Sequence, residues 1–261
     1  MIYDLQKGSL LKRASAFLLD AILLAIIAVG FALILSSIFG YNKYNNIYSD
    51  GIDKYARQYN VDFENIVSQA DFDALTQEER ANYEAAIDAM NNDWEILNAM
   101  NVIVRMIVAI TSVSIFLGFM VIEFLLPMIF KNGQTVGKKI FGLAVMRKNG
   151  VRIRAITLFL RTFLGKYVIE TMIPVLIILV TIFNAIGIMP GPGLIGFGIV
   201  LGLLLVNVLM LFTTKTNSMI HDAVSDCVVV DMASQLIFED EKSMIEYKAN
   251  KAAEEAAAKR D

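Results

Sequence analysis

Apolar residues in this chain are gathered into four long blocks that polar segments separate. A helix that crosses a membrane needs about 20 predominantly apolar residues, and each block is long enough to supply one. The last two blocks are separated by Met189-Pro190-Gly191-Pro192-Gly193, which breaks a helix and predicts a tight turn at 189–193. The pattern therefore predicts an all-α membrane protein, a four-span transmembrane helical bundle with spans at 14–39, 102–130, 169–188 and 194–213.

The composition supports the bilayer as the solvent of these blocks. Of the 261 residues, 56% are hydrophobic and 19% are charged, whereas a soluble domain has roughly 45–50% apolar and about 25% charged residues. A single cysteine, Cys227, and a single histidine, His221, exclude an internal disulfide framework and a zinc site of the Cys/His type built from this chain alone. No catalytic triad or phosphate-binding glycine loop is evident in the sequence, so we expect neither an enzyme nor a bound cofactor.

The charges predict which ends of the spans face the cytoplasm. The loop 131–156 carries seven bases and no acid, whereas residues 40–99 carry four bases and twelve acids. Because cytoplasmic loops hold the excess of Lys and Arg, we expect a cell-membrane protein with residues 1–13 and the tail, 214–261, in the cytoplasm. The first block is longer than the apolar region of a cleavable signal peptide, which has about 7–15 residues, so we expect it to remain as a span.

The segment between the first two spans, 40–101, is expected to be extracytoplasmic and helical in its later part. Thr76 and Glu79 have the spacing of a capping box. An apolar stripe with helical spacing follows them, at Tyr83, Ile87, Met90, Trp94 and Leu97. No glycine or proline lies between Thr76 and Gly118, so we expect a helix able to continue directly into the second span. The segment either packs on itself or on lipid headgroups, or it binds a partner or ligand.

The basic loop is expected to contain a β-hairpin. Asn149-Gly150 is a strong hairpin signal because both residues tolerate positive φ. Cys227 to Val230 could add a third strand, since a lone hairpin is marginal in water. An amphipathic interfacial helix is expected at 157–168, before the third span, and the tail after about Ser234 is expected to be an exposed helix or a disordered end.

Several ionisable side chains lie in the inner half of the predicted bundle, where a charge is costly and marks a function or an internal pair. Asp20 and Glu123 each lie roughly 10 Å from the cytoplasmic boundary, at about 1.5 Å per residue, and Arg13 shares the helix face of Asp20. The other polar groups that converge there are Arg161, Lys166, Glu170, Asn207, His221 and Asp222. Lys166 and Glu170 are four residues apart, so we expect them to share one helix face. In a structural interpretation Arg13, Arg161 or Lys166 neutralises Asp20 and Glu123, and the pairs fix the helix register. In a functional interpretation the acids bind a proton or a small cation.

The expected partners follow from the charge and from the number of spans. The basic loop fits anionic lipid headgroups better than nucleic acid, because it connects two spans. Four helices are few for a complete transport path, so we also expect a homodimer or a partner subunit.

Four sequence elements resemble those of the RDD family, which is named for one arginine and two aspartates. In that family the arginine starts the first helix and the first aspartate lies within it, as Arg13 and Asp20 do here. The four elements, in chain order, are Lys12 to Asp20, the inner-loop motif Gly133 to Val145, Leu160-Arg161, and the closing Ser218 to Asp222, in which Asp222 is the candidate second aspartate. The resemblance covers roughly residues 8–232.

The resemblance implies a bacterial or archaeal membrane protein, of a family for which transport of unidentified ligands is usually proposed and of which some members are described as sodium/proton antiporters. We hypothesise that this chain moves a small cation or a proton through Asp20 and Glu123. Asp222 is a further candidate, and the charge partners are Arg13, Arg161, Lys166 and Glu170. The alternative is a non-transporting membrane scaffold or sensor that binds a partner through the outer segment, which is longer than family members usually have.

Overall fold

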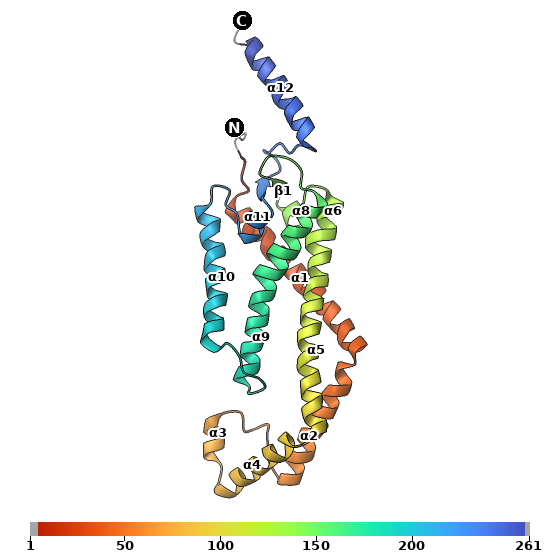
Figure 1. The fold of residues 1–261 in the computed structure, drawn as a ribbon, viewed down its shortest axis with the longest axis vertical. Coiled ribbons are helices and arrows are strands. Elements are labelled where there is room, and N and C mark those ends of the chain that lie inside the picture. The colour runs from red at the N-terminus through yellow and green to blue at the C-terminus, as the bar shows by residue number, and fades with distance from the viewer. Residues whose placement is uncertain (1–4, 259–261) are drawn as a thin grey trace. The chain divides into compact units, whose positions relative to one another are not determined.

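The computed structural model describes residues 5–258, which form two compact units. Unit 1 comprises the residues up to 29 and those from 114 onward, and unit 2 comprises residues 30–113. In the described part of the chain, four helices are long and apolar enough to cross a membrane (Figure 1), at Leu10–Phe39, Trp94–Phe130, Ala155–Ala185 and Gly193–Thr213. The prediction of a four-span helical protein is confirmed.

The first span, α1 (Leu10–Phe39), directs a face of small and polar side chains into unit 1. Its buried residues are Ala16 and Asp20, whereas large apolar side chains such as Phe17 and Ile22 point outward. A water-soluble helix buries its apolar stripe, but in a bilayer the lipid covers apolar side chains and the interior receives small and polar ones. The helix therefore aims Asp20 into the protein.

Two further spans each contain a π-helical segment. The second span consists of α5 (Trp94–Phe119), η1 (Met120–Leu125) and α6 (Leu126–Phe130), and the third of α8 (Ala155–Leu160), η2 (Arg161–Met172) and α9 (Ile173–Ala185). Aromatic rings pack these two spans together, with ring centroids 5.7 Å apart for Phe124 and Phe159 and 5.3 Å apart for Phe116 and Tyr167. A turn then leads to α10 (Gly193–Thr213), which packs against α9.

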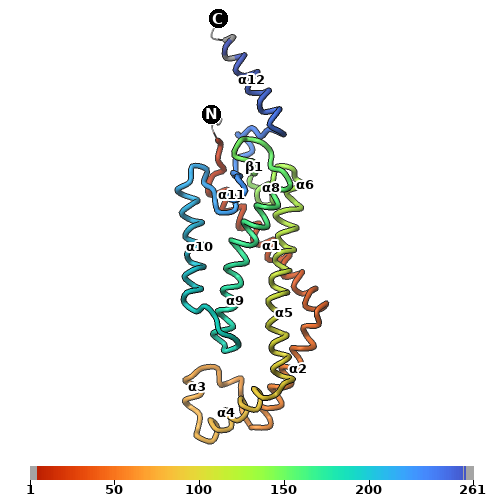
Figure 2. The backbone as a smooth tube through the Cα atoms, in the orientation of Figure 1, coloured from red at the N-terminus to blue at the C-terminus, as the bar shows by residue number. Residues whose placement is uncertain are grey.

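The third span starts earlier than the sequence indicated. Residues 157–168 and 169–188 were expected to form an interfacial helix and a separate span, but one helical run extends from Ala155 to Ala185, as the trace in Figure 2 shows. No proline lies between Ala155 and Pro174 to interrupt this helix. Arg161 and Lys166, the charges that suggested an interfacial position, are instead buried against partners inside unit 1.

A two-stranded antiparallel sheet lies near the ends of these helices. It consists of β1 (Leu143–Arg147) and β2 (Cys227–Asp231), with Val145 opposite Val229. Both of its faces are buried, one of them against Ala16 of α1 and Leu158 of α8. The expected strand at 227–230 is confirmed, and the sheet is built on its pairing with β1.

The hairpin turn forms as predicted, with Gly150 at φ 89°, but the returning arm leaves the sheet after one bridge between Met146 and Arg152. The returning arm pairs instead with a later segment, because Arg152 N–H donates to the Phe238 carbonyl at 2.8 Å. The principal partner of β1 is therefore a strand about 80 residues away in sequence, and the hairpin arm is secondary.

Unit 2 contains three helices between the first two spans: α2 (Tyr41–Tyr59), α3 (Gln69–Ala74) and α4 (Gln77–Asn91). The capping box of Thr76 and Glu79 is present at the start of α4. The helix does not run into the second span, because α4 ends at Asn91 and Asp93 caps a new helix by accepting from Glu95 N–H at 2.9 Å. Trp94, expected on the apolar stripe, is 77% exposed.

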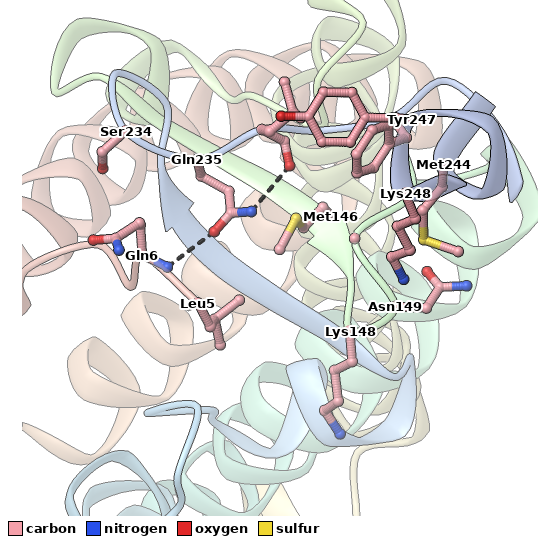
Figure 3. Close-up of a pocket in the computed structure, with 13 residues that line it drawn as sticks. Leu5, Gln6, Met146, Lys148, Asn149, Ser234, Gln235, Met244, Tyr247 and Lys248 are labelled. Atoms are coloured by element: carbon pink, nitrogen blue, oxygen red, sulfur yellow. Dashed lines mark hydrogen bonds between the residues drawn. The ribbon is translucent and has the colours of Figure 1, made fainter. Parts of the chain in front are cut away.

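The tail forms a helix, α12 (Glu241–Ala258), the first of the two expected alternatives. Its first turn is held to the hairpin by an ion pair of Arg147 with Glu241 at 3.3 Å. The N-terminal segment, the hairpin and α12 enclose a cavity of about 440 Å³ (Figure 3). The Gln235 side chain connects the N-terminal segment to the segment before α12. Its oxygen accepts from Gln6 N–H at 2.9 Å, and its nitrogen donates to the carbonyl of the neighbouring Leu236 at 2.9 Å.

Candidate functional site

A cluster of buried ionisable side chains lies in unit 1, where α1, η1, η2 and two short helices meet. The short helices are α7 (Val136–Ile140), which precedes β1, and α11 (Ile220–Val224), which precedes β2. Seven ionisable residues of the cluster are each at most 9% exposed: Asp20, Glu123, Lys138, Arg161, Lys166, His221 and Asp222. Buried charges are tolerated only when they are paired and hydrogen-bonded, so the partners define the site.

Asp20 is held by the start of α7. The Thr135 hydroxyl donates to one carboxylate oxygen, and Gly137 N–H donates to the other at 2.8 Å. A β-carbon at Gly137 would collide with the backbone of Ala16 and would lie 3.0 Å from the Asp20 carboxyl carbon. Glycine is therefore required here, because it lets the backbone of α7 touch α1 and reach the carboxylate.

Lys138 lies between the two carboxylates that the sequence placed at equal depth. Its Nζ is 3.8 Å from Asp20 Oδ2 and 3.9 Å from Glu123 Oε2, and it contacts the Thr135 hydroxyl at 3.2 Å. Burial lowers the pKa of the Lys138 ammonium to about 8, with the nearby Lys166 and Arg161 adding to the effect and Glu123 and Asp20 opposing it. Lys138 is thus a base that can release its proton near physiological pH.

Glu123 projects from η1 into the same space. Lys166 from η2 forms a close ion pair with its Oε1, and Arg161 Nη1 lies 4.0 Å from its Oε2. Among the described residues, Oε2 is the one buried side-chain oxygen or nitrogen without a hydrogen-bond partner. An unsatisfied buried acceptor is costly, so this oxygen marks a position where a ligand would be stabilised.

A proline follows two residues after the end of each π-helical segment of the site. Glu123 and Glu170 each lie four residues before a proline, Pro127 and Pro174. Proline has no N–H to donate to the carbonyl four residues earlier, and in η1 the freed Glu123 carbonyl accepts from the Thr162 hydroxyl at 2.9 Å. The local widening of both helices thus coincides with the residues that carry the charges, as π-bulges often do at functional sites.

Asp222 is the acceptor for both arginines. Arg161 Nε and Nη2 donate to Asp222 Oδ1 at 3.0 and 2.7 Å, and Arg13 Nη2 lies 3.4 Å from Oδ2. Arg13 also donates to the Asn217 carbonyl at 2.5 Å. Burial opposes ionisation of Asp222, but His221, Arg161 and Arg13 outweigh it and hold the pKa of this carboxyl well below its usual range.

His221 and Glu170 form the remaining pair. His221 Nδ1 is 2.7 Å from Glu170 Oε2, and His221 N–H donates to Oε1 at 3.0 Å. Burial lowers the pKa of His221, although Asp222 and Glu170 act in the opposite direction. Asn207 supports this element from α10, because its side-chain oxygen accepts from Ile220 N–H at 3.2 Å.

The cluster encloses a cavity and is balanced in charge. The cavity has a volume of about 210 Å³, and its lining includes Arg13, Asp20, Glu123, Lys138, Arg161, Lys166 and His221. The cluster as a whole contains four bases, Arg13, Lys138, Arg161 and Lys166, and four acids, Asp20, Glu123, Glu170 and Asp222, so it is neutral when His221 is uncharged.

The sequence-predicted residues all meet here, some with the expected partners and some with others. Glu123 pairs with Lys166 and lies near Arg161, as the structural interpretation expected. Asp20 was expected to pair with Arg13, Arg161 or Lys166, but its basic neighbour is Lys138. Lys166 and Glu170 were expected to share a helix face, but in the wider η2 each has a partner elsewhere, Glu123 and His221. Asp20 and Glu123 do line one cavity.

Lys138, Thr135 and Gly137 were missed as site residues, because the sequence analysis assigned them to a basic loop and to the inner-loop motif of the resemblance, with no role in the buried site. The available signal was the short spacing of Thr135, Gly137 and Lys138, in which a capping hydroxyl, a glycine and a base follow one another on a single helical turn.

The fold and the cluster together define a multi-span helical membrane protein with a buried, charge-balanced site. Comparison with protein families gives a match to the RDD family over residues 7–226. The chain belongs to the RDD family. All four sequence elements of the predicted resemblance contribute to the cluster, through Arg13 and Asp20, through Thr135 to Lys138, through Arg161, and through His221 and Asp222. Searches of the curated proteins and of the solved structures gave no match.

Proposed function

We propose that this protein exchanges a small monovalent cation for a proton across the membrane, and that Lys138 and the cation alternate between Asp20 and Glu123. The observation that carries the proposal is the position of Lys138, whose buried ammonium lies between the carboxylates of Asp20 and Glu123. The Glu123 oxygen that it approaches, Oε2, lacks a hydrogen-bond partner among the described residues. Its lowered pKa of about 8 supports release of the proton at physiological pH.

Charge balance favours exchange with a one-to-one stoichiometry. If Lys138 loses its proton, the cluster carries one net negative charge, and a buried uncompensated charge is unfavourable. A monovalent cation bound by Asp20 and Glu123 restores neutrality, and the neutral amine of Lys138 can serve as a further ligand. A divalent cation would leave a net positive charge, so a monovalent one is preferred.

The surroundings of the site suit this role. The cavity is large enough for a partly hydrated cation, and Thr135 and Gly137 keep Asp20 in place when Lys138 moves. Under the proposed orientation, with both termini cytoplasmic, the cavity opens from the cytoplasmic half of the bilayer. A homodimer or a partner subunit completes the path, because four spans are few for an entire transport route.

The proposal is tested with purified protein in liposomes. A gradient of Li⁺, Na⁺ or K⁺ is imposed, and internal pH is followed with a trapped fluorescent dye. We expect one of these cations to drive proton movement with a pH midpoint near 8, in line with the pKa of Lys138. Asp20→Asn and Glu123→Gln should reduce the flux to the level of protein-free liposomes. Unchanged flux in both variants would rule out the site.

A second candidate, a scaffold or sensor, is favoured by the compactness of unit 2. Tyr55 of α2 donates to Asp93 at 2.9 Å, and the side chain of Ile96 fills the space beside Gly51, so the segment has packing of its own that transport does not require. Deleting residues 45–95 separates the candidates, because an exchanger should keep its flux whereas a sensor should lose its response or its partner.

A further inference from the structure

The structure divides the seven bases of the loop 131–156 into three sets. Arg147, Lys148 and Arg152 are neutralised by acids of later segments, Glu241 at 3.3 Å, Asp226 at 3.0 Å and Glu239 at 3.5 Å. Lys138 is buried in the cluster. The remaining three, Lys131, Lys139 and Arg154, are exposed, and none of them forms an ion pair with a residue that the structure describes. We call these three the basic corner.

The basic corner lies at the ends of two spans that adjoin one another. Lys131 follows α6 directly, and Arg154 directly precedes α8. Arg152 donates to the Asn132 side chain at 3.3 Å, which brings these two ends together. Lys139 reaches the same place, because its ammonium lies 4.0 Å from the ring centroid of Phe130.

Each base of the corner has an exposed isoleucine within two residues. Ile129, Ile140 and Ile156 are 68%, 64% and 63% exposed. Isoleucines are rarely so exposed in groups on a surface that faces water, and such patches mark contacts with another apolar phase. Bases beside apolar side chains at the end of a span match a phospholipid, whose headgroup is charged and whose chains begin at that depth.

We propose that the basic corner binds the headgroup of an anionic phospholipid. The charge supports an anion, because residues 124–169 contain no acid at all. The proposal is independent of cation exchange, since none of the three bases contributes to the buried cluster. It also sharpens the general expectation for a basic loop, because it excludes the hairpin tip, where tail acids already compensate the bases.

In the test, the purified full chain in a neutral detergent is titrated with a phospholipid, either the anionic dioleoylphosphatidylglycerol or the zwitterionic dioleoylphosphatidylcholine. The bound lipid molecules are counted by native mass spectrometry. A base near a membrane surface contributes roughly fivefold to the binding of anionic lipid. We therefore expect the triple variant Lys131→Gln, Lys139→Gln, Arg154→Gln to lose affinity for the anionic lipid on the order of 100-fold. The zwitterionic lipid should bind weakly to both proteins.

The matched control removes the same number of charges from the hairpin and the adjoining tail, as Arg147→Gln, Lys148→Gln, Lys242→Gln, and should leave the affinity within about twofold, because none of these three residues holds the basic corner. A charge-preserving variant, Lys131→Arg, Lys139→Arg, Arg154→Lys, should bind as the wild type does and so shows that folding is not the cause of any loss. Equal losses in the two neutralised triples, or no preference for the anionic lipid in the wild type, would overturn the proposal.

Discussion

Lys138 and Lys139 are neighbours in the sequence and lie in opposite environments. Lys139 is exposed and rests over the ring of Phe130. Lys138 is buried between Asp20 and Glu123, and burial lowers the pKa of its ammonium to about 8. The rotation of α7 between these two consecutive residues therefore places Lys139 at the surface and Lys138 in the buried cluster, where it can exchange its proton at physiological pH.

His221 should make the stability of the protein depend on pH. Its folded-state pKa is lowered by burial, so the unfolded chain takes up a proton more readily than the folded chain as the pH falls below about 6.5. We expect the melting temperature in detergent to fall between about pH 7 and pH 5 as the stabilisation by neutral His221 is lost.

Because His221 is the only histidine in the chain, a single variant isolates this effect. His221→Gln should be less stable than the wild type at pH 7, since the contact with Glu170 is altered, and should lack the decline between pH 7 and pH 5. A decline of the same size in the variant would show that another group titrates there. Asp222 is not that group, because its pKa lies well below this range.

At the scale of elements, short helices bring the polar groups to the spans. α7 and α11 are each five residues long, and each touches a span through a glycine: Gly137 of α7 lies against Ala16, and Gly165 of η2 lies against His221. The strands that follow these helices, β1 and β2, pair with each other. The sheet therefore holds both helices against the spans.

Gly137→Ala tests the contact between α7 and α1. The added methyl group would collide with the Ala16 backbone, and such overpacking typically costs about 1–3 kcal/mol. We expect a lower melting temperature in detergent. Gly198→Ala in α10 is the control, because a β-carbon there meets nothing within 4 Å and alanine is the better helix former by about 0.5–1 kcal/mol. Equal destabilisation of the two variants would contradict the close approach.

The sequence predicted the elements better than their contacts. The four spans follow from apolar blocks alone, and the order of Arg13, Asp20, Arg161 and Asp222 follows from the resemblance. The pairing of Asp20 with Lys138 could not be predicted, because 118 positions separate them and a base in a polar loop is normally solvated. The shared face of Lys166 and Glu170 was predicted with an α-helical period, which does not apply in the π-helix η2.

At the scale of the whole molecule, the buried cluster is costly to form and is compensated in charge within itself. Eight charged groups inside a membrane protein are unfavourable unless they compensate one another, and here the four bases and four acids do so. Such a network fixes the spans in register. It also means that removal of one proton creates a deficit of one charge, which is the driving force for binding one monovalent cation in the proposed exchange.

The central claim is that Lys138 must lose its proton for each cation that binds, and the most direct test is flux in liposomes by Lys138→Arg. Arginine keeps the positive charge between Asp20 and Glu123 but does not deprotonate in this pH range. Lys148→Arg, which changes a partly exposed lysine paired with Asp226, is the matched control. We predict that Lys138→Arg folds, with no cation-driven proton movement, while Lys148→Arg matches the wild type. Wild-type flux in Lys138→Arg would contradict the account.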